Sequence, residues 1–282
     1  MTIRTIAVLG AGTMGHGIAH AAIAGGYATR MYDVSDVAVA KGRSAIDGIV
    51  RKGVELGKVT AADADAMMRR LTATSSLDEA LTDVDFIIEA APEKIDLKLS
   101  LFQQIERLAP APAIIASNTS ALSITELAGS LKAPSRVAGM HFFNPVHKMK
   151  LIEIVQALES SPATLEAIET VSRVMGKETV LVRESPGFIT TRVNASIGNE
   201  AFYMLMEGVA SARDIDKALK LGLNHPMGPF ELVDLVGLDT RLSILEYLHR
   251  SMGEKYRPCP LLAQYVKAGR LGRKVGRGVY EY

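Results

Sequence analysis

The sequence predicts an α/β fold: a Rossmann-type, mostly parallel sheet with a projecting helix pair, followed by an all-α C-terminal domain. Two observations support this fold class. Short apolar runs alternate with helical patterns as far as residue 184, which is typical of a doubly wound parallel sheet. From residue 185 onward, helical spacing of apolar residues dominates. A chain of 282 residues is long enough for two domains, so we expect them at 1–184 and 185–282.

Composition excludes several classes of protein. With 32 basic against 31 acidic side chains and 48% hydrophobic residues, nothing indicates a nucleic-acid or membrane partner. The single cysteine, Cys259, cannot form an intramolecular disulfide and has no metal-ligand spacing around it, so we expect no metal site. The uncharged stretch 5–29 contains several glycines, and we interpret it as strand, turn and helix instead of a membrane span. Residues 1–4 lead directly into that strand, so we expect no secretory signal and a cytoplasmic protein.

The most informative stretch is the apolar run 6–9, which leads into glycines at G-x-G-x-x-G spacing. The first glycine allows a tight turn, the second lets the backbone approach a pyrophosphate, and the third lets the following helix pack against the strand. The N–H groups at the start of that helix then face the phosphates. We therefore expect a dinucleotide to contact Gly10, Gly12, Thr13, Met14 and Gly15.

The context of this turn argues against the alternative, a glycine-rich turn that arises by chance. A strand precedes the turn, a helical pattern follows it, and residues 28–32 form a second predicted strand that ends at Asp33. Asp33 follows Gly15 at close to the ~20-residue spacing of the acid that accepts the ribose hydroxyls. Because a carboxylate there repels a 2′-phosphate, the cofactor is expected to be NAD.

The crossover that follows Asp33 is unusually long. It extends over residues 35–70, whereas a crossover needs only about 10–12 residues. Apolar residues at helical spacing, a stop near Gly57 and a capping box at Thr60 predict two helices that project from the nucleotide fold. Two interpretations of the basic residues on this pair stay open: a surface for a phosphate-rich ligand, or a solvated helix face. These residues are Lys41, Arg43, Arg51, Lys52 and Lys58.

Later strands are predicted at 84–90, 113–116, 137–140, 150–155 and 179–182. In a doubly wound sheet, ligands bind outside the carboxyl ends of the strands, so polar side chains there are candidates for a site. Glu93 and Lys98 follow one strand and could contact a cofactor, or they could be a helix-start acid and a solvated lysine. The polar run 117–120 follows the next strand and could equally be ordinary turn chemistry.

His141 and Glu153 lie at or in two consecutive predicted strands. A carboxylate inside the apolar run 152–154 would be costly to bury without a partner. If the two strands are neighbours, Glu153 can hold one imidazole nitrogen while the other faces a substrate. The alternative places His141 in the core and Glu153 on a solvent face.

Beyond residue 185 we expect a long helix over 188–207, a second over 211–222 and a third after the Pro-rich run 226–229. The first of these is strongly apolar, with Phe202, Met204, Leu205 and Met206. Because one small bundle would not hide so many apolar side chains, we expect this domain to form a homodimer.

Seven motifs occur in order along the chain: the glycine-rich turn, Ser117-Asn118-Thr119-Ser120, His141-Phe142-Phe143-Asn144-Pro145, Glu153, Pro186-Gly187-Phe188, His225-Pro226-Met227-Gly228-Pro229 and the segment 272–280. Taken together, these motifs resemble the 3-hydroxyacyl-CoA dehydrogenase family, most closely its short bacterial 3-hydroxybutyryl-CoA dehydrogenases, over essentially the whole chain. The resemblance implies an enzyme that interconverts (S)-3-hydroxyacyl-CoA and 3-oxoacyl-CoA with NAD, on short chains such as 3-hydroxybutyryl-CoA. The helical domain would then serve dimerisation and substrate binding.

The resemblance also implies roles for single residues. His141 matches the general base, Glu153 the residue that orients it, and Ser120 a serine that contacts substrate and cofactor. Glu93, Lys98, Asn144 and Lys274 match cofactor contacts, and the projecting helix pair matches the region that meets coenzyme A.

One position departs from the family pattern. Thr191 stands where the family commonly has an asparagine that steadies the substrate, and Asn194 lies one helical turn later. Thr191 can still donate one hydrogen bond. Two other functions stay open: a catalytically lapsed nucleotide-binding protein, and a dehydrogenase of a free hydroxy acid.

Overall fold

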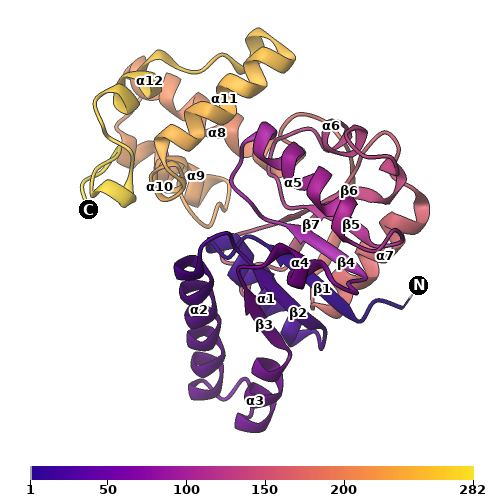
Figure 1. The fold of residues 1–282 in the computed structure, drawn as a ribbon. Helices are drawn as coiled ribbons and strands as arrows, with labels where there is room; N and C mark the ends of the chain where they lie inside the picture. The colour runs from indigo at the N-terminus through magenta and orange to yellow at the C-terminus, as the bar shows by residue number, and fades with distance from the viewer. Residues whose placement is uncertain (1) are drawn as a thin grey trace. The chain divides into compact units, whose positions relative to one another are not determined.

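The computed structural model describes residues 2–282, and the chain divides into two compact units, one ending at Glu184 and the other beginning at Ser185 (Figure 1). The division falls where the sequence pattern changes from alternating strands and helices to helices alone.

The first unit is built on a sheet that, in residues 2–282, has eight strands in the order β3-β2-β1-β4-β5-β6-β7-β8. Neighbouring strands are parallel except for β6 and β7, which pair antiparallel. The direction in which the strand order grows reverses between β1 and β4, where the ligand site of a doubly wound sheet is expected. The predicted Rossmann-type, mostly parallel sheet is thereby confirmed. The strands are β1 (Thr5–Leu9), β2 (Ala28–Tyr32), β3 (Leu71–Thr74), β4 (Phe86–Glu89), β5 (Ile114–Ser117), β6 (Val137–Phe142), β7 (Leu151–Gln156) and β8 (Glu178–Arg183).

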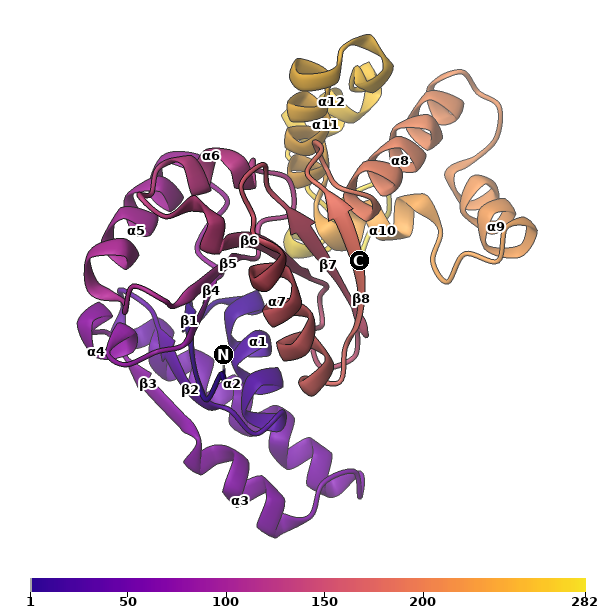
Figure 2. The same ribbon diagram turned by 90° about the vertical axis from the view of Figure 1, so that its right-hand side faces the viewer.

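Helices cover both faces of this sheet (Figure 2). On one face, α1 (Thr13–Ala24) and α7 (Pro162–Val174) bury Ile18 and Ile168 in a common apolar core with the strands. On the other face lie α4 (Leu77–Leu81), α5 (Ile95–Leu108) and α6 (Ile124–Gly129). The two shortest of these, α4 and α6, were not predicted, because helices of 5 and 6 residues are too short to show helical periodicity.

The predicted helix pair is confirmed as α2 (Asp36–Glu55) and α3 (Ala61–Arg69), and it projects beyond the sheet (Figure 1). Ser35 and Thr60 cap the two helices by accepting hydrogen bonds from backbone N–H groups. Ile46 and Val50 on α2 are buried, whereas Leu56, Gly57 and Lys58 in the connection between the two helices are exposed.

The second unit is helical, with its own apolar core. Its main helix, α8, begins at Thr190 because Gly187 and Phe188 have positive φ angles of 74° and 50° and cannot belong to it. Phe202 packs edge-on against Phe230 inside this core and is fully buried, so it adds nothing to the exposed apolar surface that the dimer prediction invoked. The helices are α8 (Thr190–Met206), α9 (Ala212–Gly222), α10 (Pro229–Val236), α11 (Leu238–Met252) and α12 (Pro260–Lys267).

Two further observations concern residues 2–282 as a whole. None of their helices combines the length and the apolar character needed to cross a membrane. Across the same residues, no three side chains of His, Cys, Asp or Glu are grouped so that they could hold a metal ion.

Candidate active site

The glycine-rich turn connects β1 to α1 in the shape that a pyrophosphate requires. Gly10 has a φ of +113°, and a Cβ there would lie 2.6 Å from the carbonyl oxygen of Ala90. A Cβ at Gly15 would collide with the carbonyl group of Gly10, so α1 can approach the turn this closely only with glycine. A Cβ at Gly12, in contrast, would meet nothing within 4 Å, which leaves open space beside the backbone for a ligand.

The amino terminus of α1 has the features of an anion-binding site. Gly12 is the residue before the helix and supplies no side-chain cap, and the first turn contains no acidic residue. The first N–H groups of a helix have no intrahelical partners, and the helix dipole favours negative charge there. Thr13 is exposed and Met14 half-buried at this end. These observations match the geometry in which a dinucleotide pyrophosphate binds.

Asp33 lies at the carboxyl end of β2, beside the turn. Its Oδ2 accepts a hydrogen bond from the Ala11 N–H at 2.9 Å, and its Oδ1 lies 3.4 Å from the Ser35 N–H. The carboxylate is thus held at the edge where ribose hydroxyls are expected. Arg30, the nearest arginine in the sequence, donates to the carbonyl groups of Glu79 and Thr82, so its guanidinium is engaged elsewhere.

A buried polar network lies at the carboxyl ends of β4 and β5. Lys98 Nζ donates to Glu89 Oε1 at 2.5 Å and to the Ala91 carbonyl at 3.0 Å, and Ser117 Oγ donates to Glu89 Oε2 at 2.6 Å. Glu89 and Lys98 are 0% and 1% exposed. The interpretation of Lys98 as a solvated lysine is therefore wrong. The ammonium group of Lys98 already donates hydrogen bonds to Glu89 and Ala91. That Lys98 contacts the cofactor stays a prediction.

Glu93 and Ser120 lie close together. Glu93 Oε1 accepts hydrogen bonds from Thr119 Oγ1 at 2.5 Å and from the Ser120 N–H at 3.0 Å, and it lies 3.4 Å from Ser120 Oγ. Lys98 Nζ is 3.5 Å from the other oxygen of Glu93. The polar run after β5 is thus an ordered turn whose serine hydroxyl lies beside a carboxylate.

This turn is also tied to the strand that carries His141. Asn118 Oδ1 accepts a hydrogen bond from the Phe142 N–H at 2.9 Å, and β5 and β6 are parallel neighbours. Asn118 is one of four polar residues in the run 117–120, and only the pairing of the two strands reveals its role. Asn144, a predicted cofactor contact, lies two residues after the end of β6 and is exposed.

His141 and Glu153 face each other on the antiparallel strands β6 and β7. His141 Nδ1 lies 2.7 Å from Glu153 Oε2, and the two residues are 6% and 0% exposed. The alternative that placed Glu153 on a solvent face is therefore wrong. A carboxylate at this distance fixes the tautomer of the imidazole and stabilises the imidazolium ion, which is the arrangement of a general base and its orienting acid.

The other predicted site residues belong to the second unit. Thr191 is half-buried in the first turn of α8, and Asn194 on the same helix is exposed. Lys274 Nζ lies 2.6 Å from both carboxylate oxygens of Asp239. The segment that carries Lys274 is held by Asp234, which is 1% exposed and accepts the N–H groups of Val279 and Tyr280.

Two models of one protein family together match almost the whole chain. The family model described as the 3-hydroxyacyl-CoA dehydrogenase NAD binding domain matches residues 5–185, and that of the C-terminal domain matches residues 187–282. A probable 3-hydroxybutyryl-CoA dehydrogenase from Bacillus subtilis is 46% identical over 283 residues, which cover 100% of this chain and 98% of the relative. A 3-hydroxybutyryl-CoA dehydrogenase from Bradyrhizobium diazoefficiens is 42% identical over 281 residues, with 99% and 96% covered. The crystal structure of (S)-3-hydroxybutyryl-CoA dehydrogenase from Ralstonia eutropha superposes with a TM-score of 0.96 at 44% identity, with 100% and 99% covered.

Proposed function

This chain belongs to the 3-hydroxyacyl-CoA dehydrogenase family, and on that premise we propose that it interconverts (S)-3-hydroxyacyl-CoA and 3-oxoacyl-CoA with NAD. A short acyl chain, as in 3-hydroxybutyryl-CoA, is proposed because relatives with 42% and 46% identity carry that name. One observation supports this chemistry: His141 Nδ1 lies 2.7 Å from Glu153 Oε2. The hydrogen bond fixes the orientation of the imidazole, so that its other nitrogen can act as a base.

In the oxidative direction, His141 accepts the proton of the substrate's 3-hydroxyl group. Nδ1 is engaged with Glu153, so the proton is taken up at Nε2, and the imidazolium ion that forms is stabilised by the carboxylate. NAD, when bound, supplies the acceptor for the hydride that leaves the third carbon. In the reverse direction, His141 returns the proton to the oxygen of the 3-oxo group, which becomes a hydroxyl.

The glycine-rich turn would hold the cofactor. Asp33 would accept hydrogen bonds from the ribose hydroxyls, and the N–H groups at the amino terminus of α1 would bind the phosphates. Glu93, Lys98, Asn144 and Lys274 are proposed as further contacts, and Lys98 Nζ also lies 3.5 Å from Glu93 Oε2. Ser120 Oγ is proposed to donate a hydrogen bond to the substrate oxygen. Thr191 is proposed to steady the substrate in place of the family asparagine.

Coenzyme A is proposed to bind the projecting helix pair, and the structure narrows the choice of contacts. Arg51 forms an ion pair with Asp47 at 2.8 Å, and Lys52 forms one with Glu55 at 2.8 Å, so these two cations are already balanced. In residues 2–282, Lys41, Arg43 and Lys58 form no such pair with a carboxylate. These three exposed cations are therefore the preferred candidates for the phosphates of coenzyme A.

We also propose a cytoplasmic homodimer formed by the helical unit. Met206, Val209, Leu221 and Leu223 are 44%, 64%, 77% and 66% exposed, and a second copy would cover such side chains. Analytical ultracentrifugation at micromolar concentration tests this, and the mass of a single 30.3-kDa chain would contradict it.

The proposed activity is tested by following NADH oxidation with acetoacetyl-CoA and with free acetoacetate. We expect kcat/KM for the thioester to exceed that for the free acid by at least about 100-fold, because binding energy from the remote part of a substrate lowers the barrier of the reaction. Equal rates would favour a dehydrogenase of free hydroxy acids. NADH binding without oxidation of NADH by either compound would indicate a catalytically lapsed protein.

A further inference from the structure

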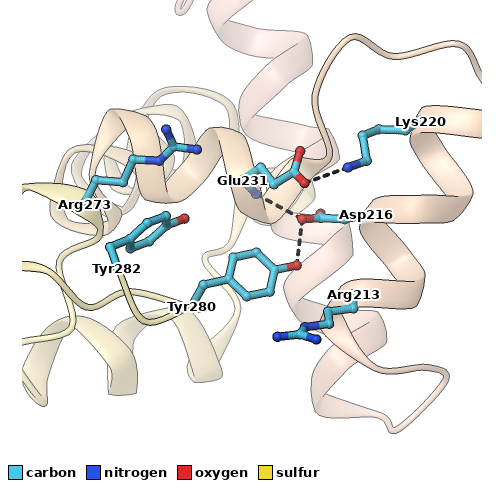
Figure 3. Close-up of a pocket in the computed structure, with 7 residues that line it drawn as sticks. All are labelled: Arg213, Asp216, Lys220, Glu231, Arg273, Tyr280 and Tyr282. Carbon is cyan, nitrogen blue, oxygen red and sulfur yellow. Dashed lines mark hydrogen bonds and ion pairs between the residues drawn. The ribbon is translucent and has the colours of Figure 1, made fainter.

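The second unit contains an open pocket of about 400 Å³ that none of the proposed catalytic or cofactor-binding side chains lines (Figure 3). Its walls come from α9, α10 and the segment after α12. Three basic residues, two acidic residues and two tyrosines line it. The ligand that suits the pocket depends on which of these charges are already balanced.

Asp216, one of the two acids, accepts hydrogen bonds from three neighbouring groups of the protein. It is 2% exposed, and it accepts hydrogen bonds from the Phe230 N–H at 2.8 Å, the Glu231 N–H at 3.1 Å and the Tyr280 hydroxyl at 2.7 Å. Figure 3 shows this carboxylate between Glu231 and Tyr280, with the Tyr280 hydroxyl directed at it. Its role is to join α9, α10 and the C-terminal segment into one rigid wall.

Glu231, the other acid, is paired. Its Oε1 lies 2.6 Å from Lys220 Nζ, and its Oε2 accepts the Gly228 N–H at 3.0 Å. The hydrogen bond from Lys220 holds the pKa of Glu231 below its ordinary value. Lys220 and Glu231 thus cancel each other's charge at one side of the pocket.

The other two cations of the lining are Arg213 and Arg273, and Arg273 hydrogen-bonds Tyr282 while its charge helps to lower the pKa of Glu231. In the described part of the chain, neither Arg213 nor Arg273 forms an ion pair. Arg273 lies over the ring of Tyr282, 5.0 Å from its centroid, and Arg213 extends into the opposite side of the pocket (Figure 3). Three cations against the carboxylates of Asp216 and Glu231 leave the lining with a formal excess of one positive charge on a hydrogen-bonded wall.

We propose that this pocket binds a phosphate-bearing small molecule. Guanidinium groups match the geometry of phosphate oxygens and bind them through two parallel hydrogen bonds. A volume of about 400 Å³ lies at the small-molecule end of the range for ligand sites and exceeds what one inorganic phosphate needs. The ring of Tyr280, and the face of the Tyr282 ring that Arg273 does not cover, add flat surfaces on which the base of a nucleotide could stack. Free pyrophosphate and a nucleoside diphosphate share the chemistry that the pocket recognises.

The test uses the full chain saturated with NADH, so that neither probe can bind at the glycine-rich turn. Pyrophosphate and ADP are titrated separately by isothermal titration calorimetry. We expect at least one of them to bind, ADP more tightly if the tyrosine rings hold a base and both equally if only phosphate is recognised. The absence of binding by both probes would overturn the proposal.

Arg213→Gln is the decisive variant, because the side chain is exposed on α9 and its loss leaves the Asp216 wall intact. Loss of a charged hydrogen-bond donor should weaken binding about tenfold or more. Lys217→Gln removes a charge from the same helix outside the pocket and should bind like the parent chain. Unchanged binding by Arg213→Gln, or an equal loss in Lys217→Gln, would refute the assignment of the site to this pocket.

Discussion

His141 on β6 and Glu153 on β7 are register partners in the one antiparallel pairing that the sheet shows in residues 2–282, and their side chains meet at 2.7 Å. Residues opposite each other on antiparallel strands project to the same face, so the pairing itself brings the two groups together. The orientation of the imidazole is set by the sheet and does not depend on a flexible loop.

His141→Gln should lower turnover on acetoacetyl-CoA by about 100-fold or more, because general acid-base catalysis contributes about 10²- to 10⁴-fold. NADH affinity, measured by fluorescence titration, should stay close to that of the parent chain. His249→Gln is the matched control, since His249 lies near the surface beside Glu254. Near-normal turnover in His141→Gln would contradict the assigned role.

The parent chain should have a higher kcat/KM for NADH than for NADPH. Asp33 would repel a 2′-phosphate, and the guanidinium of Arg30 is bonded to backbone carbonyl groups and cannot neutralise one. Asp33→Asn should lower the ratio of kcat/KM for NADH to kcat/KM for NADPH by about tenfold, since charged hydrogen bonds contribute about 1.5–3 kcal/mol. Steady-state kinetics with both cofactors measure the ratio, and a parent chain that prefers NADPH would contradict the prediction.

Lys98→Met should destabilise the first unit by about 3–5 kcal/mol, because it leaves the Glu89 carboxylate buried without its cation. The double variant Glu89→Gln/Lys98→Met removes both charges and should regain much of that loss. Urea unfolding followed by circular dichroism gives the free energies. A double variant no more stable than Lys98→Met would show that the ion pair is not the cause.

Thr191→Val keeps the shape of the side chain and deletes its hydroxyl group. If Thr191 steadies the substrate, kcat/KM should fall by roughly 5- to 150-fold, which corresponds to about 1–3 kcal/mol for an unsatisfied polar partner. Thr191→Asn should retain or improve activity. The assignment fails if Thr191→Val behaves like the parent chain while Asn194→Ala loses activity, since the role would then lie one helical turn later.

His20 should make the first unit sensitive to acid. Burial, together with the positive charges of His147, Lys177 and His16, lowers the pKa of His20 from 6.5 to about 4. The unfolded chain therefore binds this proton more readily, so the stabilising contribution is complete above pH 6.5 and is lost as the pH falls toward 4. The loss amounts to at most about 3 kcal/mol. His20→Gln should show a shallower decline of the unfolding free energy between pH 7 and 4.5, and parallel curves would contradict the prediction.

Periodicity and turn chemistry were enough to predict the mostly parallel sheet and the projecting helix pair, because each is encoded within a few neighbouring residues. The pairing of His141 with Glu153 was predictable only on the condition that their strands are neighbours, which the structure satisfies. The contact of Lys98 with Glu89 and Ser117 was missed. It depends on the order of β4 and β5 in the sheet and on the burial of a lysine, which local patterns do not reveal.

The way the α2 and α3 pair is anchored has a consequence for hydrogen exchange. Ile46 and Val50 are buried toward the sheet at 0% and 3% exposure, whereas Leu56 at the far end is 57% exposed. Backbone hydrogen bonds that are covered by few buried side chains open without unfolding the rest of a protein. Amides around the connection at 56–59 should therefore exchange with solvent long before those of β1 and β4. A protease should also cut the chain there first, while the sheet stays folded.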